Sequence, residues 1–215
     1  MIYLNILVIL NKNFIDLCVH ICYRFSNNGE VVAHLITMIP FPNKKYNIIY
    51  ADPPWHYQTW GEGGNRNVTS KYKTMTMQEI WKLPINQIAE ENCILFLWVT
   101  YPKLIDGIKT IEKWGFKYST CGFSWIKKNK KTDSLFWGLG YWTRANNEIC
   151  LLATKGKPKR MSRSVHQVVM DKIREHSRKP DCVRDRIIEL CGDLPRIELF
   201  ARERVNGWDS WGNEL

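Results

Sequence analysis

Apolar and polar positions follow two different patterns along the chain from residue 44 onward, and each pattern predicts one kind of element. Apolar runs predict strands at 46–51, 93–99, 116–127, 147–155 and 196–201. Apolar positions at helical spacing predict helices at 76–83, 103–115 and 180–192. The run CILFLWV at 93–99 has no charged side chain, which is typical of a strand buried on both faces. Strands that alternate with helices predict an α/β domain with a mainly parallel sheet.

The ends of the predicted helices carry local signals of their own. Thr76 is followed three residues later by Glu79, which is the capping-box pattern of a helix start. Gly115 stops the second helix, and the third has Pro180 at its start and Gly192 at its end. Ligands of such sheets bind at the carboxyl ends of the strands, so the residues that follow the strands are the candidates for a site.

The first 37 residues lie outside this alternation. Residues 2–10 are apolar apart from Asn5, but the run is shorter than the about 20 apolar residues of a membrane span. It also lacks the basic start and the small-residue cleavage site of a signal peptide. We therefore expect residues 1–37 to form a helical or irregular extension without membrane contact, and residues 38–215 to form the functional domain. One hypothesis is that translation starts at Met38 and that the extension is not essential.

Composition favours a single globular domain with an anionic partner. The 215 residues suffice for one domain, and 45% hydrophobic and 24% charged residues are ordinary globular proportions. The formal net charge of +10 favours a nucleic-acid partner. Lys and Arg concentrate in 127–131 and 155–163, which predicts a basic stripe on the surface. The ten tryptophans fit either a tryptophan-rich core or a site that stacks on planar rings.

The cysteines and glycines argue against several classes of protein. Seven cysteines are scattered without a C-x-x-C pair, which favours reduced thiols in a cytoplasmic protein and argues against a zinc site, so no metal is expected. The sequence has no G-x-G-x-x-G fingerprint, which argues against a nicotinamide or flavin enzyme. It has no Walker phosphate-binding loop either.

The segment ADPPW (51–55) follows the first predicted strand, at the end where ligands bind. Asp52 supplies acceptor oxygens, and the two prolines fix the backbone and remove N–H donors, so few donors compete for the carbonyls. An acceptor-rich site beside Trp55 suits a planar ring that carries an amino group, such as a nucleobase. The alternative is an Asx-type turn with Trp55 packed on the core. Physical arguments alone weigh the two interpretations evenly.

Together with further segments, this motif resembles the MT-A type of adenine-specific amino-methyltransferases, and favours the phage and bacterial branch that methylates DNA. The resemblance runs from about Tyr46 to Leu215, with the motifs in the order of the family. Besides ADPPW, the matching segments are YKTMTMQEI (72–80), LFLWVT (95–100), WGFKYSTCGFSWIKKN (114–129), NNEICLLATKG (146–156), HSRKPD (176–181), RIELFAR (196–202) and GWDSWGNE (207–214). The resemblance implies a Rossmann-like class I methyltransferase fold with helices on both faces of the sheet. Residues 38–215 would then be the methyltransferase domain.

The resemblance also implies roles for individual residues. Asp52 and Pro53 match the acceptors of the target amino group, and Pro54 and Trp55 match walls of the base pocket. Tyr72 and Glu148 match positions beside the acceptor site. S-adenosyl-L-methionine is the implied cofactor, and the residues that match its binding site are Asp52, Lys179, Arg202, Asn213 and Glu214.

The residues outside the motif also have simpler structural interpretations. The alternative for Lys179 is a solvated cation at a helix start, although the HSRKPD motif favours the functional role, and the alternative for Glu148 is a surface charge at a strand end. Arg202 is equally explained by an ion pair with Glu198 or Glu203. These alternatives predict separate surface residues, whereas the implied roles predict that the residues meet at one site.

The implied activity is methyl transfer from S-adenosylmethionine to the exocyclic N6 amine of adenine in nucleic acid. DNA is favoured over RNA because the chain is short and has no accessory domain, and a base in a duplex would have to flip into the pocket. The alternatives are an RNA adenosine methyltransferase and a catalytically silent nucleic-acid-binding subunit, although the intact DPPW argues against the second. The expected setting is the cytoplasm of a bacterium or a phage-infected host cell, and both a monomer and a homodimer are compatible with the sequence.

Overall fold

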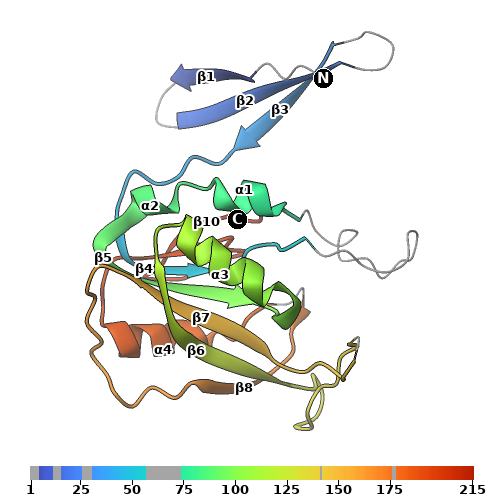
Figure 1. Cartoon of the computed structure of the whole chain (residues 1–215), viewed down its shortest axis with the longest axis vertical. Helices are drawn as coiled ribbons and strands as arrows, with labels where there is room; N and C mark the ends of the chain where they lie inside the picture. The colour runs from blue at the N-terminus through green and yellow to red at the C-terminus, as the bar shows by residue number, and fades with distance from the viewer. Residues whose placement is uncertain (1–4, 12–15, 26–30, 57–73, 141, 176–177) are drawn as a thin grey trace.

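The computed structural model describes the backbone of residues 5–11, 16–25, 31–56, 74–140, 142–175 and 178–215, and the side chains from residue 39 onward. In these residues a seven-stranded sheet has the order β10-β9-β4-β5-β7-β6-β8 (Figure 1). Its strands are β4 (Tyr46–Ala51), β5 (Ala89–Val99), β6 (Lys117–Lys128), β7 (Glu148–Lys155), β8 (Val168–Lys172), β9 (Arg196–Leu199) and β10 (Asp209–Trp211). Strand β7 is antiparallel to β5 and β6, and the other neighbours are parallel. The predicted mainly parallel sheet is confirmed.

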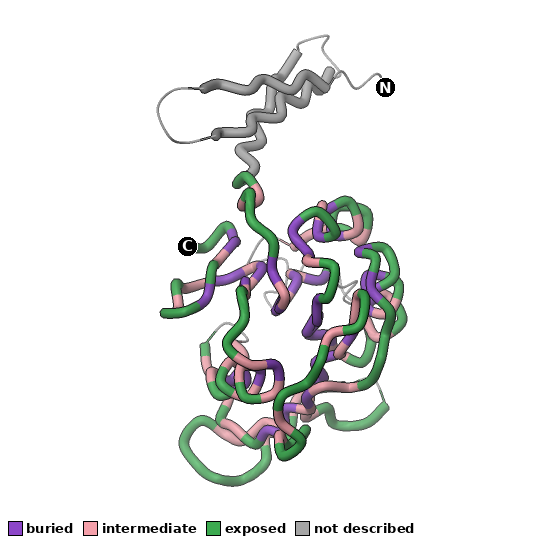
Figure 2. The backbone as a smooth tube through the Cα atoms, turned by 90° about the vertical axis from the view of Figure 1, so that its left-hand side faces the viewer, coloured by how far each residue is buried: buried purple, intermediate pink, exposed green. Residues whose placement is uncertain are grey.

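Helices cover both faces of this sheet, as the predicted fold class requires. The helices are α1 (Met77–Trp81), α2 (Ile85–Ile88), the 3-10 helix η2 (Tyr101–Lys103), α3 (Leu104–Lys113) and α4 (Cys182–Cys191). Helices α1 to α3 contribute Ile80, Ile85 and Ile111 to one hydrophobic cluster, and α4 contributes Ile187 to the other. Buried segments (purple in Figure 2) run through the interior between these layers. No helix in the described part of the chain is long and apolar enough to cross a membrane.

Strand β5 lies at the centre of the sheet and serves both clusters. Its residues Leu95 and Leu97 belong to the cluster under α1 to α3, whereas Phe96 and Trp98 belong to the cluster over α4. Residues 93–99 are all buried, which confirms that this run is a strand buried on both faces. Because side chains alternate along a strand, an apolar run without interruption is what two covered faces require.

The predicted helix signals are present with small shifts in position. At α1 the Thr76 backbone N–H donates to Glu79 Oε2 at 2.7 Å, and the Glu79 N–H donates to Thr76 Oγ1 at 3.3 Å, which completes the capping box. After α3, Gly115 has a positive φ of 83°, a conformation that favours glycine at helix ends. Helix α4 ends at Gly192 as predicted, but its N-cap is Asp181, one residue after Pro180.

The hydrophobic pattern does not predict β8, β10 or α2, because these elements have only five, three and four residues. Strand β10 pairs in parallel with β9 at the edge of the sheet. The Ala201 N–H also donates to the Trp211 carbonyl at 3.0 Å. This pairing brings the last residues of the chain beside the carboxyl end of β9.

The N-terminal residues form strands, so the expectation of a helical or irregular extension is wrong. Strands β1 (Asn5–Asn11), β2 (Asp16–Phe25) and β3 (Val31–Met38) make an antiparallel three-stranded sheet. The sequences NILVILN and VVAHLITM are rich in β-branched residues, which favour extended backbone over helix. Within the described backbone, no strand of this sheet pairs with the seven-stranded sheet.

We propose that residues 38–215 fold without the N-terminal sheet. The contacts of the larger domain begin just after β3, where the Trp211 indole N–H donates to the Ile39 carbonyl at 3.1 Å and the Phe41 ring lies 4.3 Å from the Trp211 ring. A chain that begins at Met38 should therefore unfold cooperatively, within about 0.5 kcal/mol of the full chain in urea titration. Loss of the cooperative transition in the shorter chain would contradict the proposal.

Candidate active site

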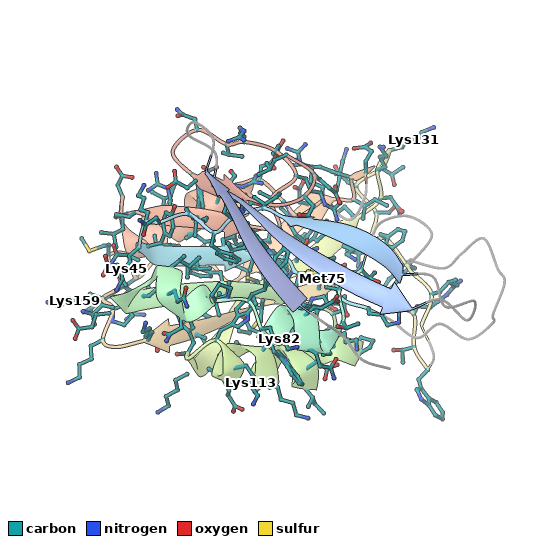
Figure 3. All side chains as sticks on the ribbon, turned by 90° about the horizontal axis from the view of Figure 1, so that it is seen from above. Lys45, Met75, Lys82, Lys113, Lys131 and Lys159 are labelled. Atoms are coloured by element: carbon teal, nitrogen blue, oxygen red, sulfur yellow. The ribbon has the colours of Figure 1, made fainter. Side chains whose placement is uncertain are left out.

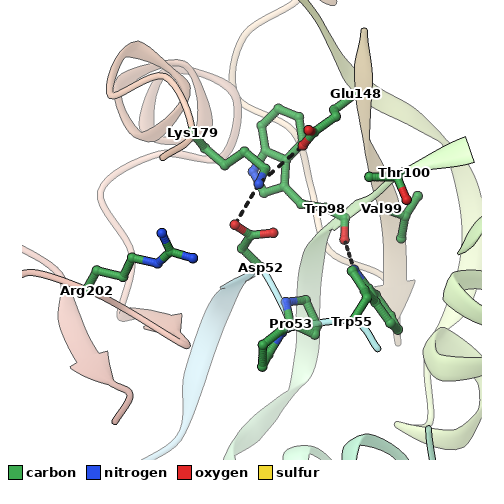
Figure 4. A pocket seen from close by; sticks show the side chains of 10 residues that line it. Asp52, Pro53, Trp55, Trp98, Val99, Thr100, Glu148, Lys179 and Arg202 are labelled. Atoms are coloured by element: carbon green, nitrogen blue, oxygen red, sulfur yellow. Dashed lines mark hydrogen bonds and ion pairs between the residues drawn. The ribbon is translucent and has the colours of Figure 1, made fainter. Parts of the chain in front are cut away.

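A pocket lies at the edge of the sheet where the parallel strands end (Figure 4). Asp52 directly follows β4, Thr100 follows β5, and Arg202 follows β9, so three parallel neighbours bring these residues to one edge. Glu148 is the first residue of β7, and because β7 is antiparallel to β5 its start lies at the same edge. Lys179 enters from the segment before α4. The topology thus gathers residues that are up to 150 positions apart, from Asp52 to Arg202.

Lys179 is held between two carboxylates in this pocket. Its Nζ lies 2.7 Å from Asp52 Oδ2 and 3.2 Å from Glu148 Oε2. The side chains of Lys179 and Glu148 are only 9% and 10% exposed, and that of Asp52 is 28% exposed. The ammonium also lies over the Trp98 ring, 5.6 Å from its centroid. The alternative of a solvated cation at a helix start is therefore wrong for Lys179.

A second lysine extends this chain of charges. Lys127, near the end of β6, places its Nζ 2.6 Å from Glu148 Oε1, and its side chain is 17% exposed. Glu148 therefore uses one carboxylate oxygen for Lys127 and the other for Lys179. The side chains of Asp52, Lys179, Glu148 and Lys127 thus alternate in charge, and we call these four residues the charge chain. Glu148 is buried, so the alternative of a surface charge at a strand end is wrong for it.

The pKa values of these groups follow from burial and from their partners. Burial raises the pKa of Asp52 above its ordinary value, and the adjacent Lys179 opposes this effect. Burial would also raise the pKa of Glu148, but Lys179 and Lys127 outweigh it and hold that pKa below its ordinary value. Burial disfavours the charged form of Lys179, yet its two carboxylates outweigh burial and raise its pKa. The lysine therefore remains a cation at neutral pH.

The two prolines make a turn whose carbonyls are already in use. The Trp55 N–H donates to the Pro53 carbonyl at 2.8 Å, and the Met75 N–H donates to the Pro54 carbonyl at 2.9 Å. The expectation that few N–H groups compete for these carbonyls is therefore wrong. A carbonyl oxygen has two lone pairs, so the Pro53 carbonyl retains acceptor capacity for a second donor.

Trp55 lines the pocket, but most of its surface belongs to the core. The side chain is 4% exposed and lies in the cluster under α1 to α3. Its indole N–H donates to the Trp98 carbonyl at 3.0 Å, and the Trp98 indole N–H donates to the Tyr50 hydroxyl at 2.7 Å. The packing alternative thus describes Trp55 better than an open stacking surface does. These bonds fix the ADPPW turn to β4 and β5.

Arg202 and the chain end meet at the same edge. Arg202 Nε lies 3.5 Å from Glu214 Oε2, and Arg202 lines the pocket with the prolines. The alternative partners of Arg202 are engaged elsewhere, because Arg184 pairs with Glu198 at 2.7 Å and Arg178 pairs with Glu203 at 2.7 Å. Both of those pairings belong to a network around the start of α4.

The remaining candidate residues lie in different places relative to the pocket. Pro54 lines the pocket, and Asn213 is exposed next to Glu214 near the chain end. Tyr72 lies outside the described residues. Four residues in or beside the pocket were not predicted as site residues: Trp98, Val99 and Thr100 line it, and Lys127 pairs with Glu148. Trp98 and Thr100 end a buried apolar run and Lys127 lies in a basic run, so each has an ordinary structural explanation in the sequence.

The two basic segments do not form one stripe. Residues 127–131 begin in the last two residues of β6 and continue beyond it, whereas residues 155–163 begin at the last residue of β7. The eight residues of β7 separate these ends by roughly 25 Å at about 3.3 Å per residue. Figure 3 shows Lys131 and Lys159 at opposite sides of the molecule. Only the segment at 127–131 therefore adds positive charge beside the pocket.

Comparisons of the sequence with known proteins show which proteins the chain resembles. The sequence model of the MT-A70 family matches residues 46–214. The Type II methyltransferase M.MunI of a Mycoplasma species is 36% identical over 192 residues, which cover 81% of this chain and 79% of that protein. The N(6)-adenosine-methyltransferase catalytic subunit METTL3 of Homo sapiens is 29% identical over 175 residues, which cover 80% of this chain and 28% of that protein. A putative N(6)-adenosine-methyltransferase MT-A70-like protein of Medicago truncatula is 31% identical, with coverage of 80% and 26%.

Proposed function

The chain belongs to the MT-A70 family and is therefore an S-adenosylmethionine-dependent adenine-N6 methyltransferase of nucleic acid, and we propose that its substrate is DNA and that the pocket around Asp52 is its active site. The observation that carries this proposal is the contact of Asp52 with Lys179 at the carboxyl ends of β4, β5 and β9. Acceptor groups on a rigid turn meet a buried cation there, as a site for an amino group and a charged cofactor requires.

The residues around the pocket fit the cofactor by charge. The methionine part of S-adenosylmethionine carries an ammonium and a carboxylate, and the pocket offers Asp52 for the first and Lys179 for the second. Arg202, Asn213 and Glu214 offer polar groups for the ribose and adenine part at the same edge. When bound, S-adenosylmethionine supplies an electrophilic methyl group on its sulfonium.

The remaining acceptors suit the target amine. An ionised carboxylate offers about four lone-pair sites, so Asp52 can accept the adenine amino group while Oδ2 accepts from Lys179. The Pro53 carbonyl offers a second acceptor on the turn. Two such bonds favour a pyramidal nitrogen with a localised lone pair. Holding the amino nitrogen in a fixed orientation lowers the barrier to methyl transfer by several kcal/mol, on the order seen for other positioned reactants.

The preference for DNA rests on extent and access. The matched region covers 79% of M.MunI, a Type II methyltransferase, whereas the chain spans only about a quarter of the length of the adenosine-methyltransferases. The pocket floor is built from buried side chains, so an adenine in a duplex must leave the stack to reach Asp52. We place this reaction in the cytoplasm of a bacterium or of a phage-infected cell.

Nucleoside mass analysis distinguishes the candidate substrates. DNA and RNA are isolated from cells that express the chain or its Asp52→Ala variant, and N6-methyladenine is measured in each pool. We expect methylated adenine in DNA from cells with the wild-type chain alone. Methylation confined to RNA would overturn the choice of DNA, and no methylation in either pool would favour a catalytically silent subunit.

The charge chain predicts a positioning role for Lys127. Lys127→Met should lower the methyl-transfer rate about tenfold, equivalent to about 1.4 kcal/mol, because Glu148 would lose one of its two cations and draw Lys179 away from Asp52. Single-turnover rates across pH measure this effect, since the acidic limb of the profile should move to higher pH. Lys127→Arg should retain most of the rate.

The neighbouring lysine is a matched control for this variant. Lys128 pairs with Asp133 at 3.6 Å, and Asp133 is 83% exposed, so at saturating DNA Lys128→Met should leave the single-turnover rate within about twofold. An unchanged rate and pH profile in Lys127→Met would show that Lys127 only holds the fold.

A further inference from the structure

The loop between β6 and β7 displays large apolar side chains, and it leaves the sheet at the same edge as the pocket. Trp137 is 59% exposed, Leu139 is 78% exposed and Trp142 is 98% exposed. Tryptophan is highly buried on average in folded proteins, and the other tryptophans of this domain for which burial is described are mostly buried. Exposed apolar residues that gather on one segment mark interaction sites. We call the described residues 135–140 and 142–144 the aromatic loop.

The aromatic loop has a defined backbone that holds these side chains outward. At its base the Phe136 N–H donates to the Lys127 carbonyl at 2.9 Å, and the Gly138 N–H donates to the Ala145 carbonyl at 2.7 Å. Asn146 closes the base, because its amide exchanges hydrogen bonds of 3.0 Å with the backbone N–H and carbonyl of Lys127. The exposure of the tryptophans is therefore built into a bonded loop.

A glycine permits the tight turn at the tip of this loop. A Cβ on Gly140 would lie 2.0 Å from the Thr143 carbonyl oxygen, which is closer than any side chain tolerates. A Cβ on Gly138 would lie 3.1 Å from the Ala145 carbonyl oxygen, a tighter contact than most side chains make. Glycine at 140 thus lets the backbone lie close against the Thr143 carbonyl. The turn presents the apolar residues on a compact projection.

The surroundings of the loop are basic and adjoin the pocket. Residues 127–145 contain five Lys or Arg and one Asp. The loop leaves the sheet at Lys128, the end of β6, and returns at Glu148, which lines the pocket and pairs with Lys127 at 2.6 Å. Figure 1 shows the connection from β6 to β7 projecting beyond the sheet at this edge. A nucleic-acid strand whose target base occupies the pocket would run close to this loop.

We propose that the aromatic loop is a nucleic-acid contact surface, in which Trp137 and Trp142 stack on bases next to the flipped adenine and the nearby cations bind phosphates. Removal of one base from a duplex exposes the faces of its neighbours, and an aromatic side chain can cover such a face. Exposed tryptophans suit a partner that offers flat apolar faces. The lysines and arginines beside them suit a partner that is anionic. Nucleic acid meets both conditions.

This proposal rests on the proposed function, and steady-state kinetics on a methylatable duplex test it. The Trp137→Ala/Trp142→Ala double variant should raise KM for DNA by at least about tenfold, as expected for the loss of base stacking. Its affinity for S-adenosylmethionine should stay within twofold, because Lys179 and Asp52 are unchanged. The Trp142→Phe variant should recover most of the loss, since phenylalanine keeps an aromatic face.

Met161→Ala is the matched control, because Met161 is 72% exposed and lies in the segment at the opposite end of β7. It should leave KM unchanged. If the wild-type chain methylates DNA and the double variant keeps its KM, the loop proposal fails alone. If the double variant keeps its KM but changes the mass in sedimentation, the loop is a self-association surface and the proposal is overturned. If the wild-type chain methylates no nucleic acid, the proposed function fails first.

Discussion

Replacement of Asp52 by alanine is expected to abolish methyl transfer, with a loss of at least about a thousandfold, as for removal of a key polar group from an active site. The variant removes the acceptor that holds the target amine and leaves the Pro53 carbonyl alone on the turn. Single-turnover methylation of DNA measures the loss. Binding of S-adenosylmethionine, measured by calorimetry, should weaken but survive, because Lys179 and Arg202 still line the pocket.

The fold should tolerate this change. Lys179 keeps Glu148 at 3.2 Å after the loss of Asp52, so its charge remains paired. Asp106→Ala is a matched control, because Asp106 is 30% exposed and pairs with Lys103 at 3.0 Å, much as Asp52 is 28% exposed and pairs with Lys179. Asp52→Asn keeps the side-chain volume and should also be inactive. Turnover within tenfold of wild type in either Asp52 variant, with the control active, would refute the assignment.

Local patterns in the sequence predict the elements that place the site. The strand at 46–51 and the capping box at Thr76 occur where the pattern places them, because both depend on neighbouring residues. The alternation of strands and helices is enough to predict that Asp52 and Arg202 follow strands of one sheet. Their meeting at one edge then follows from the parallel pairing of β4 with β9.

Contacts between distant segments escape such prediction. The donor to the Pro54 carbonyl comes from Met75, and the second cation on Glu148 comes from Lys127, 21 residues earlier. Neither pairing has a local signal, since a basic run such as 127–131 is equally consistent with a solvated surface. The prediction of a single basic stripe is wrong for the same reason. The sequence does not reveal that β7 carries the chain to the opposite end of the sheet. Short strands such as β10 depend on pairing with β9 and have no periodicity of their own.

The charge chain also explains why the site has two carboxylates and two lysines. A single buried pair of Asp52 and Lys179 would leave part of the ammonium unsatisfied, since it has three donors. Glu148 accepts from Lys179 on one side and from Lys127 on the other, which fixes the direction in which Lys179 points. Methyl transfer needs a carboxylate in one orientation, and a chain of alternating charges holds that orientation.

Loss of the central cation should have the largest effect on stability. Lys179→Met would leave Asp52 and Glu148 as neighbouring carboxylates with no ammonium between them. Breaking a buried ion pair from one side costs about 3 kcal/mol or more, so the free energy of unfolding in urea should fall by about that amount at pH 7. The matched control is Lys44→Met, because Lys44 also pairs with an aspartate at 2.8 Å but is 56% exposed. It should cost less than about 1 kcal/mol.

The pH dependence distinguishes this electrostatic cost from a packing defect. In the wild-type chain the pKa of Glu148 is lowered. Its contribution to the free energy of unfolding is therefore complete above the unfolded pKa of about 4.3, and it is lost as pH falls through the pKa of the folded state. In Lys179→Met, burial and mutual repulsion should raise the pKa of Asp52 and Glu148 above their unfolded values, so the variant loses stability as pH rises through the raised values. The difference between the two chains should therefore be largest near pH 7 and shrink below about pH 4, where protonation removes the repulsion. A difference that stays constant from pH 7 to pH 4 would show that Lys179 acts through packing, and a difference below 1 kcal/mol at pH 7 would show that the charge chain does not stabilise the fold.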